Sequence, residues 1–239
     1  MSGRLRSGRA ATPRVHVVSL ADADEGAAVP VGGGDLNHLR RVLRLADGAA
    51  VELFDDAGLT AAAVLSGNTA TVTAVEAAAV GGLVVAAAVP KGQRADWMVE
   101  KLCALGAAAW VRLACERSAV RPGAGKFDRY RRVAVEAAKQ SRRAGVLRVE
   151  PMVGAIEFLT AATAPPAVLT TQGDARSAVE VLAKVRTVLV GPEGGWGETE
   201  LKAFADGGCG PVTLGPTVLR VETAAVAAAA VWASVQSAS

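Results

Sequence analysis

Apolar residues follow two different patterns along the chain, and the change between them lies near residue 80. Before that point, short segments rich in Val, Leu and Thr alternate with turn residues such as Asp-Gly. Such a pattern is typical of a small β-barrel domain. The expected strands are residues 15–18, 50–54, 60–65 and 69–75. A short helix is expected over residues 38–45, after a glycine-rich turn at 31–35, with Asp35 or Asn37 as its cap.

The second half of the chain has longer units. Residues 83–89 form a continuous apolar run that ends at Pro90, as expected for a strand covered on both faces. Apolar positions then recur at helical spacing over residues 95–105, and Gly106 is expected to end that helix. Further strands are expected at 110–113, 167–171 and 187–190, with helices at 126–143, 179–184, from 198 onward and at 223–235. This strand–helix–strand order predicts a parallel α/β sheet.

Composition limits the classes of protein to consider. Hydrophobic residues make up 51% of the 239 residues and aromatic residues only 4%, so the core must consist mainly of Ala, Val and Leu. A net charge of +3 does not by itself indicate a nucleic-acid partner. The three cysteines are widely spaced and the two histidines lie far from them, so no metal site is predicted. Because no apolar run approaches the roughly 20 residues of a membrane span, we expect a cytoplasmic protein without a membrane partner.

A glycine-rich motif, Gly191-Pro192-Glu193-Gly194-Gly195, directly follows the strand that ends at Val190. Glycines let backbone N–H groups approach a ligand closely, and the start of the next helix adds a partial positive charge. However, neither the dinucleotide fingerprint nor the phosphate-binding P-loop pattern is present, and the Glu193 carboxylate would repel a phosphate. The motif therefore predicts a site for a neutral or cationic ligand. A plain strand-to-helix turn is an equally good interpretation of this motif alone.

Residues 121–148 contain the strongest concentration of positive charge. On a helix over 126–143, Arg129, Arg132, Lys139 and Arg143 fall on one stripe, which Glu136 interrupts. A stripe of one sign fits a phosphate backbone, although a merely solvated helix face gives the same pattern. The residues expected on the inward side of this helix are Tyr130, Ala134, Ala137, Ala138 and Ser141.

A second motif, Leu214-Gly-x-x-x-Leu219-Arg220-x-Glu222-Thr223-Ala224, follows the first. Together the two motifs resemble the RsmE family of ribosomal RNA methyltransferases, which belongs to the SPOUT class. Further matches are H-L-x-R-V-L-R-L-x-x-G from His38, K-x-x-R from Lys91, Glu116-Arg117-Ser118 and Gln140-Ser141-x-Arg143, so the resemblance covers nearly the whole chain. Three residues depart from the family pattern, since glutamate, proline and serine are usual at Ala104, Arg112 and Gly197.

The resemblance implies an α/β fold in two domains. Residues 1–78 are expected to form a PUA-like RNA-binding β-barrel, and residues 82–239 a parallel-sheet SPOUT methyltransferase domain with a trefoil knot, joined by a linker at 77–82. S-adenosylmethionine is expected to bind at three strand ends. The implied cofactor-binding residues are Leu169, Thr170, Thr171, Val190, Gly191, Pro192, Glu193, Gly194, Gly195, Leu214, Gly215, Val218, Leu219 and Thr223. The implied RNA-binding residues are Arg40, Arg41, Arg44, Arg129, Arg132, Lys139 and Arg143.

The implied reaction is methyl transfer to N3 of one uridine in the 16S ribosomal RNA of the small subunit. Uracil N3 must lose its proton before it can attack, and negative charge then spreads to the neighbouring carbonyl oxygens. We expect Arg220 to stabilise that charge and Glu222 to accept the proton or orient Arg220. A purely structural Arg220–Glu222 pair is the alternative. The apolar final helix suggests burial against a second subunit, so a homodimer is expected, with no DNA partner.

Three other functions are compatible with parts of the sequence. An α/β enzyme that uses NAD or a nucleotide would share the parallel sheet, but the phosphate-binding patterns are missing. A non-catalytic RNA-binding or ribosome-assembly protein would need only the first domain and the basic helix. A related methyltransferase acting on another base or RNA would share every motif.

Overall fold

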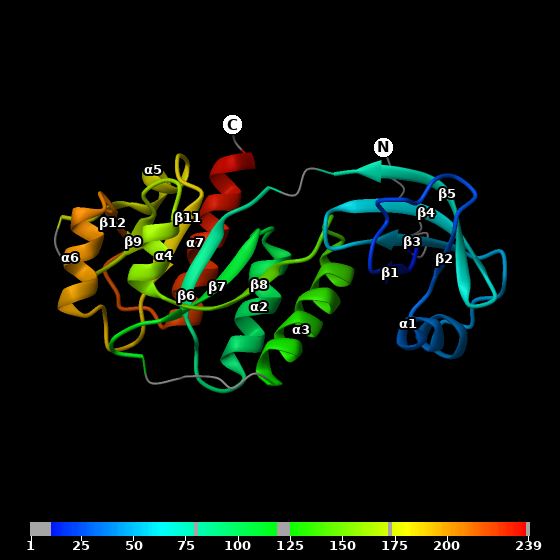
Figure 1. Cartoon of the computed structure of the whole chain (residues 1–239), viewed down its shortest axis with the longest axis horizontal. Coiled ribbons are helices and arrows are strands. Elements are labelled where there is room, and N and C mark those ends of the chain that lie inside the picture. The colour runs from blue at the N-terminus through cyan, green and yellow to red at the C-terminus, as the bar shows by residue number, and fades with distance from the viewer. Residues whose placement is uncertain (1–10, 79–80, 119–124, 172–173, 238–239) are drawn as a thin grey trace, which may run out of the picture. The chain divides into compact units, whose positions relative to one another are not determined.

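The computed structural model describes residues 11–78, 81–118, 125–171 and 174–237 of the chain. Two compact units, Met1–Ala79 and Val80–Ser239, each contain a sheet of their own (Figure 1). Residues 79 and 80 of the expected linker and Arg121 of the basic segment lie outside the described residues. No helix among the described residues combines the length and the apolar composition that a membrane crossing requires.

Unit 1 contains a five-stranded mixed sheet with the order β1-β3-β4-β5-β2. Strand β1 runs parallel to β3, whereas the other neighbours are antiparallel. The meander predicted from alternating apolar residues is confirmed, although β2 was not predicted because its three residues show no alternation. The strands are β1 (Arg14–His16), β2 (Ala28–Pro30), β3 (Ala50–Phe54), β4 (Leu59–Ser66) and β5 (Thr69–Ala77).

The inward residues of these strands form the core of unit 1. Val51 and Leu53 of β3 are buried together with Leu65 of β4 and Val72 of β5, as the two-residue period of a strand requires. The Asp55 carboxylate organises the turn between β3 and β4, since it accepts hydrogen bonds from the backbone N–H groups of Gly58 and Leu59, both at 2.9 Å. The backbone N–H of Leu20 donates to its other oxygen at 3.0 Å.

The predicted helix of unit 1 begins earlier than expected. Helix α1 spans Gly33–Asn37 and continues directly into one wide π-helical turn, η1, over His38–Val42. Its N-cap is Gly32, so the predicted capping by Asp35 or Asn37 is wrong. Local preference would not start a helix in three glycines. Packing outweighs it here, because Leu36 is half-buried and Leu39 fully buried against the sheet.

Unit 2 contains a seven-stranded, all-parallel sheet with the order β10-β12-β9-β11-β6-β7-β8 (Figure 1). The predicted parallel α/β fold is therefore confirmed. The central strands are nearly all buried, as their continuous apolar runs indicated. The strands are β6 (Val84–Ala88), β7 (Ala109–Ala114), β8 (Arg148–Gly154), β9 (Ala167–Leu169), β10 (Arg176–Ser177), β11 (Thr187–Val190) and β12 (Gly210–Thr213).

Six helices are described in unit 2. They are α2 (Arg94–Ala104), α3 (Gly125–Ser141), α4 (Ala155–Ala161), α5 (Ala178–Leu182), α6 (Glu198–Asp206) and α7 (Val221–Ser237). Helix α7 packs against α2, α5, β6 and β11, while α4 packs against α6. Gly106 ends α2 with a φ of +79°, as predicted from its place after the last apolar position.

Helix α3 differs from its prediction at its end. It stops at Ser141, two residues before the predicted end, because Arg142 has a φ of +55° and leaves the helical path. Tyr130, Ala134, Ala137 and Ala138 are buried as expected, but Ser141 is exposed.

The structure explains why arginine can stand at position 112, where the family pattern usually has proline. This residue lies in β7, where its buried guanidinium donates through Nε to the carbonyl oxygen of Glu150 at 2.9 Å and stacks on Phe127 at 4.9 Å. The neighbouring strand β8 shifts register at this point, between the partners of Val111 and Arg112. A proline at position 112 could not make these side-chain contacts. Arginine therefore replaces the usual proline at this position while the side chain stays buried and leaves no gap in the core.

Candidate active site

A cavity of about 530 Å³ lies where β9 and β11 end and where the segment after β12 returns to α7. In a parallel sheet these strand ends share one edge, which is the usual ligand-binding edge of such sheets. The cavity is lined by Arg117, Leu169, Thr170, Thr171, Val190, Gly191, Pro192, Glu193, Gly194, Gly195, Trp196, Glu198, Leu201, Leu214, Gly215, Thr217, Val218, Leu219, Val221 and Ala224.

The structure brings together all the predicted cofactor-binding residues except Thr223 around this cavity. Thr223 lies in the first turn of α7 with its side chain exposed. Sequence reasoning missed several lining residues, among them Arg117, Trp196 and Glu198. These belong to the Glu-Arg-Ser match and to the glycine-rich stretch, so the signal for them was present in the motifs.

The loop after β11 is held from beneath by Trp196. This indole is 7% exposed and packs edge-to-face on Phe204 of α6 at 4.8 Å between ring centroids. Gly191 lies directly on it, because a Cβ at Gly191 would be 2.8 Å from the indole Cε2 atom. Gly195 has a φ of +74° and its N–H donates to the Pro192 carbonyl at 2.9 Å, which closes the turn. Both glycines are therefore required by the backbone path of the cavity wall.

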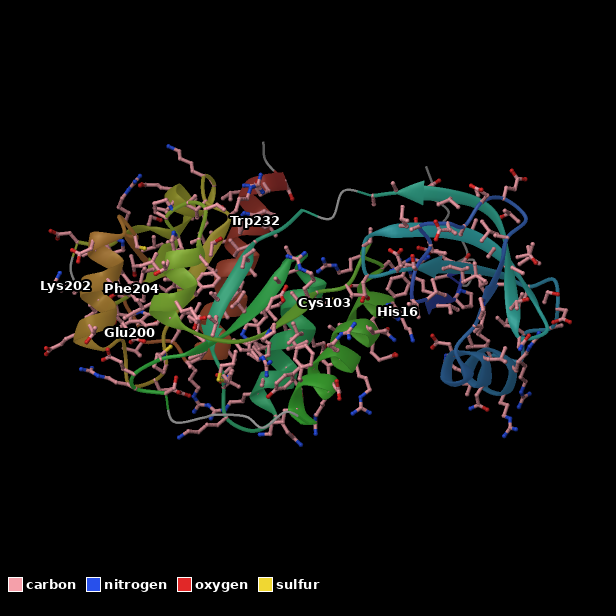
Figure 2. All side chains as sticks on the ribbon, in the orientation of Figure 1. His16, Cys103, Glu200, Lys202, Phe204 and Trp232 are labelled. Carbon is pink, nitrogen blue, oxygen red and sulfur yellow. The ribbon has the colours of Figure 1, made fainter. Side chains whose placement is uncertain are left out.

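Glu200 connects two loops beside the cavity. It is 2% exposed; its Oε2 accepts from the Gly197 N–H at 2.8 Å and its Oε1 from the Glu116 N–H at 3.1 Å. Figure 2 shows Glu200 and Phe204 on the inner side of α6, and Lys202 on the outer side. The first contact caps the start of α6, and the second joins α6 to the loop after β7.

The same arrangement accounts for glycine at position 197. A Cβ there would lie 1.7 Å from Oε2 of Glu116 and 2.4 Å from its Cδ. A serine would therefore displace the Glu116 side chain. Glycine at the N-cap is only a few tenths of a kcal/mol less favourable than serine.

Arg117 extends from this loop over the glycine-rich segment. Its Nη1 donates to the Gly194 carbonyl at 3.3 Å, and a Cβ at Gly194 would be 3.1 Å from the Cβ of Arg117. Glycine at 194 thus allows the close approach of two loops that come from β7 and β11. Together they form one wall of the cavity.

The second motif forms the other wall. The Thr213 hydroxyl donates to the Gly215 carbonyl at 2.9 Å and accepts from the Gly215 N–H at 3.1 Å, which fixes the turn where Gly215 has a φ of +145°. Leu214 and Leu219 are half-buried, whereas Val218 is 84% exposed although it lines the cavity. This wall therefore presents apolar side chains to a ligand.

Arg220 and Glu222, the predicted catalytic pair, do not contact each other in any described interaction. Arg220 is exposed, and its carbonyl accepts the first hydrogen bond of α7, from Ala224 at 2.8 Å. Glu222 is 5% exposed and pairs instead with Arg94 of α2, whose Nη1 is 3.5 Å from Oε1 of Glu222. Neither member of the predicted pair lines the cavity, although Leu219, Val221 and Ala224 beside them do.

The predicted RNA-binding residues of unit 1 differ in their surroundings. Arg40 donates to the carbonyls of Leu45 at 2.9 Å and Gly67 at 2.8 Å and pairs with Asp47. The hydrogen bond from Arg40 lowers the pKa of the Asp47 carboxyl. Arg40 therefore braces the helix against a hairpin, whereas Arg41 and Arg44 are exposed.

The predicted basic stripe of unit 2 also divides into two groups. Arg129 and Arg132 are exposed on α3, and Arg129 pairs with Asp96 at 2.5 Å. Lys139 is half-buried and pairs with Glu136 at 2.8 Å. Arg143 lies beyond the end of α3 and donates to the carbonyls of Cys103 at 3.0 Å and Ala107 at 2.8 Å, so it caps the end of α2.

None of the described residues that line this cavity is a cysteine. Burial raises the pKa of the Cys115 thiol to about 12 and also raises the pKa of Cys103. Within the described ranges, no three His, Cys, Asp or Glu side chains lie together in a way that would hold a metal ion.

Two protein-family models match the chain. The RNA methyltransferase domain matches residues 77–233, and the RNA methyltransferase PUA domain matches residues 31–75. The ribosomal RNA small subunit methyltransferase E of Mycobacterium bovis is 32% identical over 234 residues, covering 86% of each chain. The protein of the same name from Synechocystis is 28% identical over 218 residues, covering 85% of this chain and 72% of the relative.

A solved structure shares this fold. The ribosomal RNA small subunit methyltransferase E of Neisseria gonorrhoeae, crystallised with S-adenosylmethionine, is 27% identical with a TM-score of 0.77, covering 92% of this chain and 95% of the other. The correspondence extends over both units. They therefore represent a PUA-like domain and a SPOUT methyltransferase domain.

Proposed function

The chain belongs to the ribosomal RNA small subunit methyltransferase E (RsmE) family of RNA methyltransferases, and we propose on this basis that it methylates N3 of one uridine in 16S ribosomal RNA with S-adenosylmethionine as the methyl donor. One observation carries the proposal. The residues of two motifs that lie apart in the sequence enclose a single cavity at the carboxyl edge of the parallel sheet.

The lining residues fit S-adenosylmethionine. The volume of about 530 Å³ falls within the usual range of ligand pockets. Backbone N–H and C=O groups at Gly191 and Leu219 and the C=O group of Gly195 would bind the adenine edge, and Leu214 and Val218 would cover its faces. Glu193 either stands near the sulfonium or braces its own loop, and a carboxylate is compatible with a cationic ligand in both cases. When bound, this cofactor supplies an electrophilic methyl group, and no metal is required.

The start of α7 is assigned to the reacting end of the site. Arg220 is exposed beside Leu219, where its guanidinium would donate to a uracil carbonyl and stabilise the negative charge that develops as N3 loses its proton. Glu222 either accepts that proton or orients a guanidinium. Its burial and its ion pair with Arg94 favour the second role.

RNA contact is proposed for both units. Residues 1–78 would bind RNA as a PUA-like domain, and residues 82–239 would carry out the transfer. Arg41 and Arg44 in unit 1 and Arg129 and Arg132 on α3 are exposed and therefore available to phosphates. Arg40, Lys139 and Arg143 have protein partners, which supports a bracing role for each of them.

We further propose a cytoplasmic homodimer with a trefoil knot in the second domain. The support for the dimer comes from α7, where Val226, Ala227, Ala230 and Val231 are only half-buried although the helix is almost entirely apolar. Light scattering at micromolar concentration is expected to give twice the chain mass. A monomer would contradict the dimer without affecting the proposed chemistry.

The function is tested with isotopically labelled S-adenosylmethionine and small ribosomal subunits that lack the modification. Nucleosides are then identified by mass spectrometry, and labelled N3-methyluridine is expected. Label in another nucleoside would assign a different base. Cofactor binding without any label would indicate a different RNA, and the absence of both would favour a non-catalytic RNA-binding protein.

A further inference from the structure

A partly buried ion pair joins two segments that are far apart in the sequence and meet beside the cavity. Arg94 is the first residue of α2, and Glu222 lies in the first turn of α7. Strands β6 and β11 are neighbours in the sheet, so the loop that leads into α2 leaves the same edge as the glycine-rich loop. Helix α7 packs against α2 and against both strands. Glu222 directly follows Val221, which lines the cavity, and this places its ion pair with Arg94 close to the cavity wall.

The buried carboxylate of Glu222 needs a nearby positive charge to offset its lost hydration. Its side chain is 7% exposed, and Oε2 has no hydrogen-bond partner among the described residues. A buried carboxylate without a compensating cation is strongly unfavourable. Among the residues that the structure describes, the charged group in contact with it is the Arg94 guanidinium, whose Nη1 is 3.5 Å from Oε1, while the helix start adds a partial positive charge.

Two nitrogen atoms of the Arg94 guanidinium have partners within the described ranges of the protein, and the third does not. Its Nε donates to the Lys91 carbonyl at 3.3 Å, and Nη1 faces Glu222. Within the described part of the chain, Nη2 makes no hydrogen bond, and the side chain is 36% exposed. The contacts with the Lys91 carbonyl and the Glu222 carboxylate fix the orientation of the guanidinium. Its Nη2 group therefore keeps two N–H donors that can bind an oxygen of a ligand.

We propose that Arg94 binds a carbonyl oxygen of the target uracil, and that Glu222 is the positioning residue that holds Arg94 in place. The inference rests on the proposed function. In the reaction, the proton on N3 leaves to water and its electron pair spreads to the carbonyl oxygens. N3 then bonds to the methyl carbon while the carbon–sulfur bond breaks, with its electron pair going to sulfur. Arg94 donates to one carbonyl oxygen as the charge develops, which lowers the barrier to proton loss.

The assay measures kcat and KM for labelling of unmodified small subunits, with cofactor affinity measured separately by calorimetry. Arg94→Ala is expected to reduce kcat by about 100- to 1,000-fold, the usual loss for one oxyanion donor, with cofactor affinity within about threefold of the wild type. Arg94→Lys keeps the charge but not the fork of donors and is expected to recover part of the loss. Arg148→Ala, which breaks an exposed ion pair with Glu150 at the amino end of β8, serves as the matched control.

Glu222→Gln distinguishes positioning from direct chemistry. If Glu222 acts through Arg94, this substitution lowers kcat in the wild type but changes nothing further in the Arg94→Ala background. Multiplicative losses would overturn the positioning role, and an unchanged kcat for Arg94→Ala would overturn the whole inference. A loss confined to KM would assign Arg94 to RNA anchoring instead. A wild-type protein that forms no N3-methyluridine would refute the proposed function itself, which separates the two failures.

Discussion

The most direct test of the architecture around the cavity is the substitution Glu200→Gln. This change keeps the size of the side chain but replaces one acceptor oxygen with an NH₂ group. Each carboxylate oxygen accepts one backbone N–H, from Gly197 at 2.8 Å and from Glu116 at 3.1 Å. The glutamine amide has one acceptor oxygen, so it can accept a hydrogen bond from only one of these two N–H groups. The other N–H group would then face the NH₂ group, which is also a donor, and would stay buried without an acceptor.

The magnitude follows from the loss of one hydrogen bond to a charged acceptor, which is about 1.5–3 kcal/mol. For a unit of this size, each kcal/mol shifts the melting temperature by about 2–4 °C, so we expect a decrease of about 3–12 °C. Tryptophan fluorescence is a suitable signal, because all four tryptophans lie in unit 2 and report on it alone.

Glu198→Gln is the matched control for this experiment. Glu198 lies in the same first turn of α6 but is exposed, so its substitution removes only the favourable interaction with the helix N-terminus, about 0.3–1 kcal/mol. Glu200→Gln should destabilise the unit by clearly more than this control. Equal losses for the two variants would mean that Glu200 contributes only through the helix dipole and does not connect the two loops.

Three further predictions concern the cavity wall, the basic helix and the thiols. Gly191→Ala places a methyl group 2.8 Å from the Trp196 indole and should destabilise unit 2 by about 1–3 kcal/mol and weaken cofactor binding, as measured by denaturation and calorimetry. Arg132→Ala should weaken RNA binding and reduce its logarithmic salt dependence by about one unit or less, while Lys202→Ala on α6 leaves both unchanged in filter-binding titrations. Because burial raises the pKa of Cys115 to about 12, its thiol should resist alkylation at pH 8 until the protein unfolds, as followed by peptide mass spectrometry.

The sequence predicted the sheet and the cavity of unit 2 well because both follow from local patterns. The strand over 187–190 and the helix start at Glu198 agree with β11 and α6, and the loop between them supplies predicted residues that line the cavity. In a parallel sheet, all strand ends lie at one edge, so motifs that follow strands must converge there. The strands that were missed are β2, β8, β10 and β12. Strands β2, β10 and β12 are short, β12 begins with Gly210-Pro211, and β8 is interrupted by Pro151.

The partners of charged residues could not be predicted in the same way. Arg40, Arg143 and Glu222 were assigned from motifs, yet their contacts come from residues that no periodic pattern relates to them. Glu222 illustrates the difficulty, since its partner Arg94 is 128 positions away in the sequence. Hydrophobic periodicity specifies which face of an element is buried. It does not specify which buried carboxylate meets which guanidinium, because that depends on how two helices pack.

The cavity lies at a glycine-rich loop between a strand and a helix, an arrangement that often binds phosphate. The charges around this cavity explain why it suits a cationic ligand instead. Both α6 and α7 begin at the cavity, and each helix start carries roughly half a positive charge, which would favour an anion. Here carboxylates occupy both first turns, with Glu198 and Glu200 in α6 and Glu222 in α7. The cavity lining itself has two carboxylates, Glu193 and Glu198, and one guanidinium, Arg117. The backbone groups thus remain free to bind a polar ligand edge, while the side chains cancel the field that would otherwise repel a sulfonium.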